Sequence, residues 1–452
     1  MKISERQFAF ASVASIFGLL ITWVIPNTIA LRHLLLIAGS LSAIGLIRHN
    51  RDQFKITNAR ILPLACIFGL FGWVLIHYTF FSLNTQLELS EIKGLWMRSL
   101  LGAIAAIGLG IAIFKYTNLR LYFYIALFSA PLINVLAYCW ASYLNHGLVK
   151  PNDFVFFLFA KIETAYFGAV AGSVATGNLI LLLVGKVDKS KALQIFWWFL
   201  GLALVLVSAL VSSTKNGIAI ALGLCIFLAV VVAINPIVQK GRSSVLSIIV
   251  LTAIALLSVG IWEGHKSFAY KGWDTVLQDA AVAIDIDKNQ QWQKKEGSVP
   301  TPLNSLGVPA AINTYSRFAY ASVGLRLISE YPLGYGSVNQ SFKGLQDYAK
   351  IPHEHEGQVH SGWIDFGLAF GIPGLLLIFA SLLSIVYLGL KSKSSIAMPW
   401  VIVCLAFIPF GLIAEISYKQ YFEATIFFLA VGATVTLFAS NKAKDSLENS
   451  PK

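Results

Sequence analysis

Three histidines lie close together just before a long apolar segment: His353, His355 and His360, within residues 351–380 (IPHEHEGQVHSGWIDFGLAFGIPGLLLIFA). An imidazole titrates near neutral pH, so it can accept a proton from a hydroxyl nucleophile. The HxHx4H spacing could also suit zinc, but no fourth ligand is evident and this spacing has no metal mechanism of its own. We therefore expect a metal-free role, in which His360 deprotonates or simply orients a hydroxyl and the other two histidines are candidate supporting residues.

A lysine in the sequence SSTKNG is a candidate for binding phosphate. Lys215 lies between two apolar segments, where Thr214 or Ser213 can cap the start of a helix. A cation opposes the dipole at a helix N-terminus, unless an anion binds to both the lysine and the helix. The alternative is a lysine whose stem lies along the bundle while its ammonium group reaches the membrane interface.

Two arginines belong to one predicted helix in YSRFAYASVGLRLISEYPLGYG. Arg317 and Arg326 are nine residues apart, so they lie on opposite sides of that helix. Arg326 can pair with Glu330 four residues later, whereas Arg317 has no such partner and is the better candidate for phosphate. Glu415 follows a late apolar segment, and we expect it either to pair with Lys419 or to orient the site.

The composition places these residues in a membrane protein. Of the 452 residues, 57% are hydrophobic and 12% are charged, and the mean hydropathy is +0.71; soluble domains carry roughly 25% charged residues. Apolar runs of about 20 residues recur without β-barrel alternation. We predict an all-α integral membrane protein with about twelve transmembrane helices. They are expected near residues 8–25, 31–47, 61–83, 95–114, 120–144, 164–185, 192–212, 216–237, 244–262, 363–388, 397–414 and 420–439.

The basic residues predict the orientation of the chain. Lys and Arg gather in alternate loops, such as Arg48, Arg51, Lys55 and Arg60 in one of them. By the positive-inside rule both termini face the cytoplasm, and the long hydrophilic loop of residues 263–360 faces outward. The net charge of +12 is therefore mainly a topology signal. Because the cations are scattered over separate loops, we expect no nucleic-acid partner.

The long loop is expected to fold as a small helical subdomain. Helical spacing covers residues 274–295, and a second helix of about 15 residues should end at Pro332 and Gly334. Asp365, five residues after His360, is expected to face the bundle as a structural group. The predicted organisation has four parts: transmembrane helices in 1–262, the loop subdomain in 263–362, three further transmembrane helices in 363–440 and a disordered cytoplasmic tail in 441–452.

Together, SSTKNG, an arginine before PLGYG, and HSG leading into GIPGLLL resemble the O-antigen ligase / O-antigen polymerase superfamily of bacterial inner membranes. The resemblance covers roughly residues 195–425 and is strongest to ligases. It implies that the family's essential histidine is His360 and that its arginine upstream of the PLGYG motif is Arg317. It also implies a late acidic residue at Glu415. The family usually has arginine where this chain has Lys215, and asparagine where it has Ser361.

The resemblance also implies an activity. The expected enzyme is a glycosyltransferase of the inner membrane that needs no cofactor. It would move an O-antigen glycan from undecaprenyl diphosphate to a hydroxyl of lipid A–core, in a periplasmic active site. An O-antigen polymerase or a protein O-oligosaccharyltransferase would use nearly the same residues. A transporter for a polar lipid is a more distant alternative, because transporters keep ionisable groups near the bilayer midplane. A purely structural membrane protein would not need this loop of cations and histidines.

Overall fold

The computed structural model describes residues 4–23, 25–55, 57–149, 161–184, 189–238, 244–268, 275–354, 357–415, 417 and 419–448. Across these residues the chain is helical, and the extended pairing is one isolated bridge, between Leu303 and Pro309. Ten helical segments are long and apolar enough to cross a membrane, and two shorter apolar helices accompany them. The predicted all-α membrane fold is therefore confirmed.

The apolar helices follow the predicted segments closely. They are α1 (Glu5–Trp23), α2 (Ile29–His49), α3 (Leu62–Phe80), α5 (Met97–Lys115), α6 (Arg120–Leu144), α7 (Lys161–Val184), α8 (Lys189–Val211), α9 (Lys215–Val238), α10 (Ser244–Phe268), α14 (Gly362–Ser392), α15 (Met398–Ile413) and α16 (Lys419–Glu448). The smaller elements are η1 (Arg51–Phe54), η2 (Ala59–Ile61), α4 (Thr85–Glu91), the π-helical η3 (Ile92–Trp96), η4 (Thr117–Leu119), α11 (Val276–Ala283), η6 (Gln290–Gln293), α12 (Ile312–Glu330) and α13 (Ser341–Tyr348).

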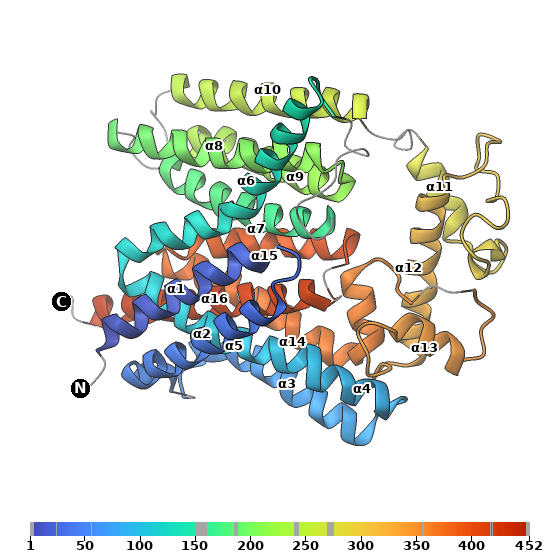
Figure 1. Cartoon of the computed structure of the whole chain (residues 1–452), viewed down its shortest axis with the longest axis horizontal. Helices are drawn as coiled ribbons and strands as arrows, with labels where there is room; N and C mark the ends of the chain where they lie inside the picture. The colour runs from blue at the N-terminus through green and yellow to red at the C-terminus, as the bar shows by residue number, and fades with distance from the viewer. Residues whose placement is uncertain are drawn as a thin grey trace.

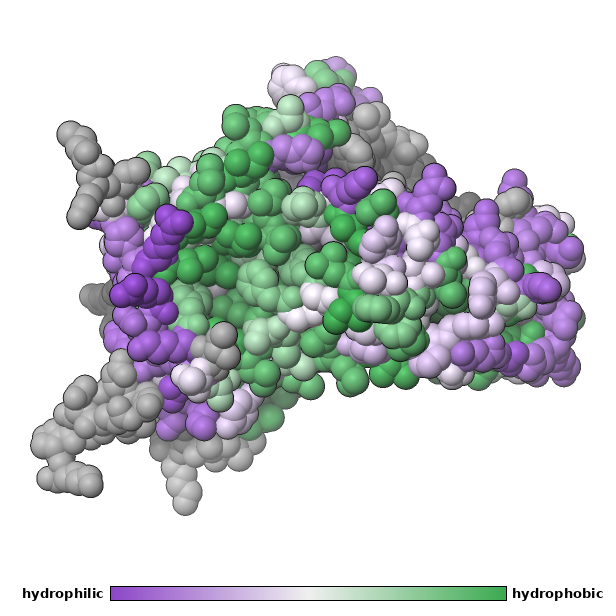
Figure 2. Space-filling model, turned by 90° about the horizontal axis from the view of Figure 1, so that it is seen from below, coloured by the Kyte–Doolittle hydropathy of each residue, from purple (hydrophilic) through white to green (hydrophobic). Residues whose placement is uncertain are grey.

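The bundle has two distinct ends. Both chain ends lie at one of them, here called the terminal end, and α11, α12 and α13 lie at the other, the long-loop end (Figure 1). A broad hydrophobic surface separates the hydrophilic residues of the two ends (Figure 2). An apolar band between polar ends is the surface expected of a protein whose middle is immersed in lipid.

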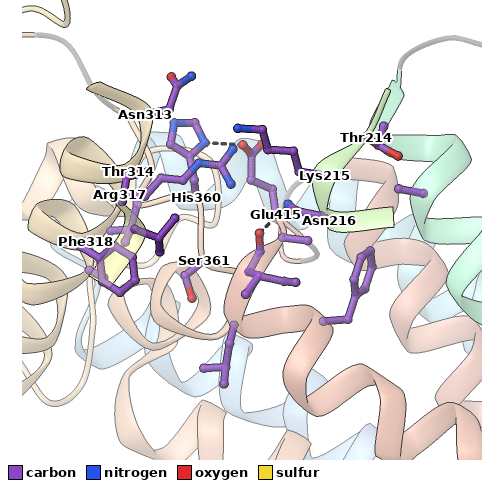
Figure 3. Close-up of a pocket in the computed structure, with 18 of the residues that line it drawn as sticks. Thr214, Lys215, Asn216, Asn313, Thr314, Arg317, Phe318, His360, Ser361 and Glu415 are labelled. Carbon is purple, nitrogen blue, oxygen red and sulfur yellow. Dashed lines mark hydrogen bonds and ion pairs between the residues drawn. The ribbon is translucent and has the colours of Figure 1, made fainter. Parts of the chain in front are cut away.

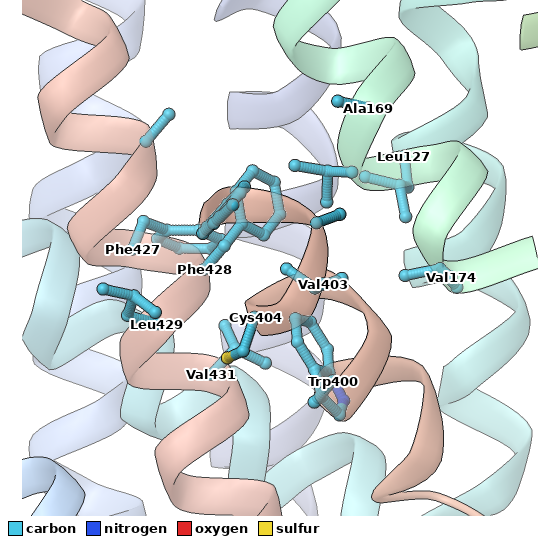
Figure 4. Packing of buried hydrophobic residues seen from close by; sticks show 14 of the residues in the cluster. Leu127, Ala169, Val174, Trp400, Val403, Cys404, Phe427, Phe428, Leu429 and Val431 are labelled. Atoms are coloured by element: carbon cyan, nitrogen blue, oxygen red, sulfur yellow. The ribbon is translucent and has the colours of Figure 1, made fainter. Parts of the chain in front are cut away.

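The centre of the bundle is packed from late and early helices together. Phe427 and Phe428 of α16 lie among α15 residues such as Trp400, with α6 and α7 around them (Figure 4). Both phenylalanines are at most 1% exposed. Lipid is as apolar as these side chains, so close van der Waals packing holds the helices together in place of water exclusion.

Helix α14 is broken in its middle. Gly371 has φ 66° and ψ −168°, and Pro373 has no N–H to donate. The left-handed φ suits glycine, and a Cβ at Gly371 would approach Pro332 O to 2.2 Å. The N–H of Ile372 donates instead to Pro332 O at 2.8 Å. At this break, the backbone of α14 therefore hydrogen-bonds to the backbone of the long loop.

The PLGYG turn of the long loop supplies the hydrogen bonds that α14 loses. Tyr335 N–H donates to Leu368 O at 2.9 Å, and Gly336 N–H donates to Ala369 O at 2.7 Å. The indole N–H of Trp73 in α3 donates to Phe370 O at 2.9 Å. All three carbonyls are therefore satisfied, as buried backbone in a membrane protein must be.

Helix α4 fixes the next residues of the loop through the carboxylate of Glu91, while its Glu88 links α4 to α3. Glu91 accepts hydrogen bonds from Ser337 Oγ at 2.7 Å and from the N–H groups of Val338 at 2.8 Å and Asn339 at 3.0 Å. Glu88 is fully buried and bonds His77 Nδ1 at 2.9 Å. The long loop is thus anchored to helices from the first quarter of the chain.

The loop helices and the last helix differ from the sequence predictions. The predicted helix of 274–295 is helical only in α11 and the short η6, because turn-forming acids and amides interrupt it; Asp285 accepts from Lys288 N–H, and Asn289 Nδ2 donates to Val282 O. The predicted second helix is present as α12, and α13 was not predicted. The prediction of a disordered tail is wrong for residues 441–448, which continue α16.

Candidate active site

A cavity of about 690 Å³ opens at the long-loop end of the bundle. Its walls come from the start of α9, the first turns of α12, the residues before α14 and the end of α15 (Figure 3). Four candidate residues line it: Lys215, Arg317, His360 and Glu415. They are separated by up to 200 positions in the sequence, so the fold brings together groups that the chain keeps far apart.

His360 lies at the junction between the long loop and α14. Its backbone is left-handed, with φ 65°, which is uncommon for a residue with a Cβ. The N–H of Gly362 donates to Ala414 O at 2.9 Å, which ties the start of α14 to the end of α15. Strained backbone of this kind costs about 1–3 kcal/mol and clusters at functional sites.

The imidazole of His360 is paired with Glu415. Its Nδ1 hydrogen-bonds Glu415 Oε1, with the two side chains 32% and 15% exposed. This hydrogen bond raises the pKa of His360 above its ordinary value, although burial and the nearby Arg317 act in the opposite direction. The carboxylate thus orients the ring and makes it a stronger base.

Asp365 supports the same junction from inside the bundle. Its Oδ1 accepts the N–H of Val359 at 2.7 Å, and its side chain is buried. This buried position agrees with the expectation that Asp365 faces the bundle as a structural group. Asp365 therefore positions the backbone on the N-terminal side of the histidine.

Two cations reach into the cavity from opposite walls. Lys215 is the first residue of α9 and Arg317 lies on α12, and both side chains are exposed and directed toward the His360–Glu415 pair (Figure 3). Within the described residues, neither forms a salt bridge to an acidic side chain. Asn216 Nδ2 donates to Ile413 O at 2.6 Å and so fixes the start of α9 against α15.

The prediction that Thr214 caps α9 is wrong. Thr214 Oγ1 is buried and has no hydrogen-bond partner among the described residues, and Ser213 adopts a left-handed φ of 50°. A Cβ at Gly217 would come within 2.5 Å of Thr214 Oγ1, so the threonine is packed against this helix without capping it. The first turn of α9 begins from a sharp reversal of the chain.

The remaining candidates lie away from the cavity. Arg326 forms a two-pronged ion pair with Asp287, at 2.8 and 2.7 Å, so the predicted pairing with Glu330 is wrong. His353 Nε2 bonds Asp347 Oδ1 at 2.9 Å. His355 and the side chain of Lys419 lie outside the described part of the chain. Among the residues that are described, no three His, Cys, Asp or Glu side chains are grouped as metal ligands would be.

Other polar lining residues were missed from the sequence. Asn313 and Thr314 precede Arg317 by four and three positions, and they line the same cavity. Helical spacing places residues at i−4 and i−3 on the same face, so these two could have been found once Arg317 was chosen. Asn216, next to Lys215, also lines it.

Comparison with known families assigns this part of the chain. Residues 200–379 match a family model described as O-Antigen ligase. The match covers less than half of the chain. It bears out the resemblance to the O-antigen ligase / polymerase superfamily, and together with the apolar helices it supports a multi-pass membrane enzyme of the glycosyltransferase type. The matched region includes Lys215, Arg317 and His360, whereas Glu415 lies beyond it. No curated protein sequence matches the chain.

Proposed function

We propose that this member of the superfamily is an O-antigen ligase. It transfers a glycan from undecaprenyl diphosphate to a hydroxyl of lipid A–core on the periplasmic face of the inner membrane. The observation that carries the proposal is one cavity at the edge of the apolar bundle in which two cations face a histidine paired with a carboxylate. A donor with an anionic leaving group and an acceptor with a hydroxyl require these two kinds of group.

Lys215 and Arg317 bind the diphosphate of the donor in this proposal. They lie on separate walls, so the two phosphates can be contacted from two sides. As the bond between the anomeric carbon and the diphosphate oxygen breaks, negative charge develops on the leaving group, and fixed cations stabilise it. Arg317 can form two parallel hydrogen bonds to phosphate, whereas Lys215 acts as a point charge.

His360 acts on the acceptor. With Nδ1 bonded to Glu415, proton transfer from the attacking hydroxyl takes place at Nε2. The acceptor oxygen forms the new bond to the anomeric carbon, its proton passes to the imidazole, and undecaprenyl diphosphate leaves. Glu415 stabilises the imidazolium that results. The lipid-linked diphosphate is itself a good leaving group, so Lys215 and Arg317 can supply the charge stabilisation.

The position of the polar groups favours transfer over transport. Transporters place their binding groups near the bilayer midplane, at interruptions of the spanning helices. In this protein α14 is interrupted at Gly371, but the backbone of the PLGYG turn and the indole of Trp73 donate hydrogen bonds to the carbonyls near the break. These carbonyls are therefore not available to a transported substrate. The cavity with the cations instead lies at the ends of α9, α14 and α15.

The proposal is tested by measuring donor binding and glycan transfer separately in purified variants. His360→Ala should retain donor binding and lose transfer by ~10²–10⁴ fold, the usual contribution of a general base. Arg317→Ala should lose donor affinity and turnover. Arg326→Ala is the matched control, because it removes an arginine from the same helix outside the cavity. Loss of donor binding in His360→Ala, or normal transfer in Arg317→Ala, would contradict these roles.

A deletion strain distinguishes the ligase from its relatives. Loss of a ligase leaves rough lipopolysaccharide, with long glycan polymer retained on the carrier lipid. Loss of a polymerase would instead leave core capped with a single repeat unit, and loss of a protein transferase would leave lipopolysaccharide unchanged. Profiling both lipopolysaccharide and carrier-linked glycan in this strain identifies the acceptor.

A further inference from the structure

A second cavity, of about 970 Å³, lies at the terminal end of the bundle. Its walls are the chain from η1 to the start of α3, the last turns of α14 and the end of α16. Its walls belong to elements near the chain ends, whereas the candidate active site is bordered by the loop helix α12 at the other end of the bundle (Figure 1). Nothing in the proposed glycan transfer uses it.

The lining of this cavity is positively charged. Lys55, Arg60 and Lys391 line it together with one acidic residue, Asp52. Asp52 pairs with Lys55 at 3.3 Å, but the two side chains are 76% and 65% exposed. Exposed pairs of this kind are weak, so Lys55 can turn toward an anion at little cost.

The floor of the cavity is a fixed set of amides. Asn441 of α16 accepts hydrogen bonds from Asn58 Nδ2 at 2.9 Å and from Arg60 Nη1 at 3.3 Å, and its own Nδ2 donates to Gln53 Oε1 at 2.7 Å. Asn441 is only 9% exposed. These bonds hold the guanidinium of Arg60 in place before any ligand binds, which reduces the entropy cost of binding.

Apolar residues border the charged ones. Leu62 at the start of α3 is 51% exposed and Tyr387 of α14 is 60% exposed, and both line the cavity. Lys391 lies 5.4 Å from the centre of the Tyr387 ring and donates to its hydroxyl at 3.2 Å. The cavity therefore joins cations to the lipid-facing surface of two spanning helices.

We propose that this cavity binds the phosphate head group of an anionic membrane phospholipid. Basic pockets between transmembrane helices at the membrane surface recognise such head groups. Arg60 and Lys391 contact the phosphate, Lys55 approaches from the exposed side, and the acyl chains lie against Leu62 and Tyr387. A soluble phosphate would use the cations but would gain nothing from the apolar border, and this difference identifies the ligand as a lipid.

The test uses the full-length protein in detergent, titrated with phosphatidylglycerol and analysed by native mass spectrometry. The double variant Lys55→Gln, Lys391→Gln should bind this lipid about 30-fold more weakly, since each cation near a membrane surface contributes about 1 kcal/mol. The matched control is Arg48→Gln, Arg51→Gln. It removes two exposed cations from the same end of the bundle, and neither lines the cavity. This control should bind phosphatidylglycerol as the wild type does.

Two further probes separate the sources of the phosphate. Phosphatidylethanolamine and inorganic phosphate should each bind much more weakly than phosphatidylglycerol. Equal affinity for inorganic phosphate would show a site for a soluble anion and overturn the lipid assignment. An equal loss of phosphatidylglycerol affinity in the two double variants would show that only the general surface charge matters. That result would overturn the proposal that the cavity is the binding site.

Discussion

At the scale of single residues, the orientation of His360 is determined from three directions. Glu415 holds the ring through Nδ1, Asp365 holds the preceding backbone through Val359 N–H, and the left-handed φ of 65° directs the residue out of the line of α14. A flexible histidine would spend most of its time out of reach of a bound hydroxyl. Under the proposed mechanism, a ring that is held in place before substrate binds would lower the barrier to transfer, because the entropy cost of orienting it is not incurred during the reaction.

Because the bond to Glu415 raises the pKa of His360, we expect the pH dependence of transfer to shift in Glu415→Gln. The base must be neutral, so the wild-type rate should rise with pH around a midpoint above the ordinary value of about 6.5. Glu415→Gln removes the hydrogen bond that is the largest cause of the raised pKa of His360; burial and Arg317 continue to lower this pKa and Asp365 continues to raise it, so the midpoint should move to lower pH. The maximal rate should also fall, roughly 10- to 100-fold, since the base is weaker.

The measurement is the transfer rate of purified enzyme from pH 5 to 9 in both proteins, with donor saturating. Unshifted midpoints would mean that another group titrates, and His360 would then only orient the acceptor.

Lys215 can be tested by restoring the residue that the family usually carries. Lys215→Arg should keep much of the activity, because the charge persists and the guanidinium suits phosphate. Lys215→Ala should lose roughly 10²–10³ in turnover through lost charge stabilisation. Donor binding and transfer are measured in both variants. If arginine is as damaging as alanine, the shape of lysine matters and the diphosphate role is wrong.

At the scale of elements, the broken helix α14 and the PLGYG turn depend on each other. The turn donates to the carbonyls of Leu368 and Ala369, and the break provides the space that the turn fills. Gly334 and Gly336 have φ values of 94° and 99°, so both glycines are needed for the backbone to approach this closely.

Gly336→Ala should therefore release the long loop from the bundle. A Cβ there would lie 2.2 Å from Glu88 Oε2, and the φ of 99° adds strain. Strain and overpacking each cost about 1–3 kcal/mol. The expected result is faster proteolysis within residues 294–311 and a lower melting temperature.

The control for this variant is Gly102→Ala in α5, where a Cβ would meet nothing within 4 Å. It should be neutral or stabilising by up to about 1 kcal/mol, as alanine is in helices. Similar proteolysis of the two variants would show that the turn is not closely packed in solution.

The sequence reveals the spanning helices well, because their long apolar runs are a local property. It also indicates α12, through its helical spacing and its stop at Pro332. It does not reveal α13 (SFKGLQDY), which is short and amphipathic and is shaped by its contacts with the bundle. The pairing of His360 with Glu415 joins residues 55 positions apart, and only the packing of α14 against α15 brings them together. Likewise, Arg326 has Asp287 as its partner because α12 lies beside α11.

At the scale of the whole molecule, the two ends of the bundle carry different chemistry. The long-loop end holds the cavity with the histidine, and the terminal end holds the cavity with three cations and no histidine. On the face that Figure 2 shows, the surface between them is mostly hydrophobic. Which end meets the cytoplasm determines which substrates the protein can reach.

The clustering of Lys and Arg in alternate loops predicts that the terminal end is cytoplasmic. A phosphatase reporter fused within residues 290–300 should therefore be active, and a reporter at 390–394 should be inactive. Fusions with a cytoplasmically active reporter at the same two places should give the complementary pattern. The opposite pattern would put His360 in the cytoplasm and overturn the proposed periplasmic active site.

The break at Gly371 has a consequence for the position of His360 relative to the PLGYG turn. The part of α14 from Gly362 to Phe370 is a short helical segment, about 13 Å long. The PLGYG turn is attached near its C-terminal end, and His360 lies just before its N-terminal end. The length of this segment therefore determines the distance between the imidazole of His360 and the PLGYG turn. One inserted alanine would rotate the N-terminal end of the segment by about 100° and move it along the helix axis by about 1.5 Å. This change would move the His360 ring away from Glu415, although every side chain of the cavity would still be present. We therefore expect this segment to tolerate substitutions better than insertions or deletions, because a shift in helical phase cannot be compensated by any single substitution.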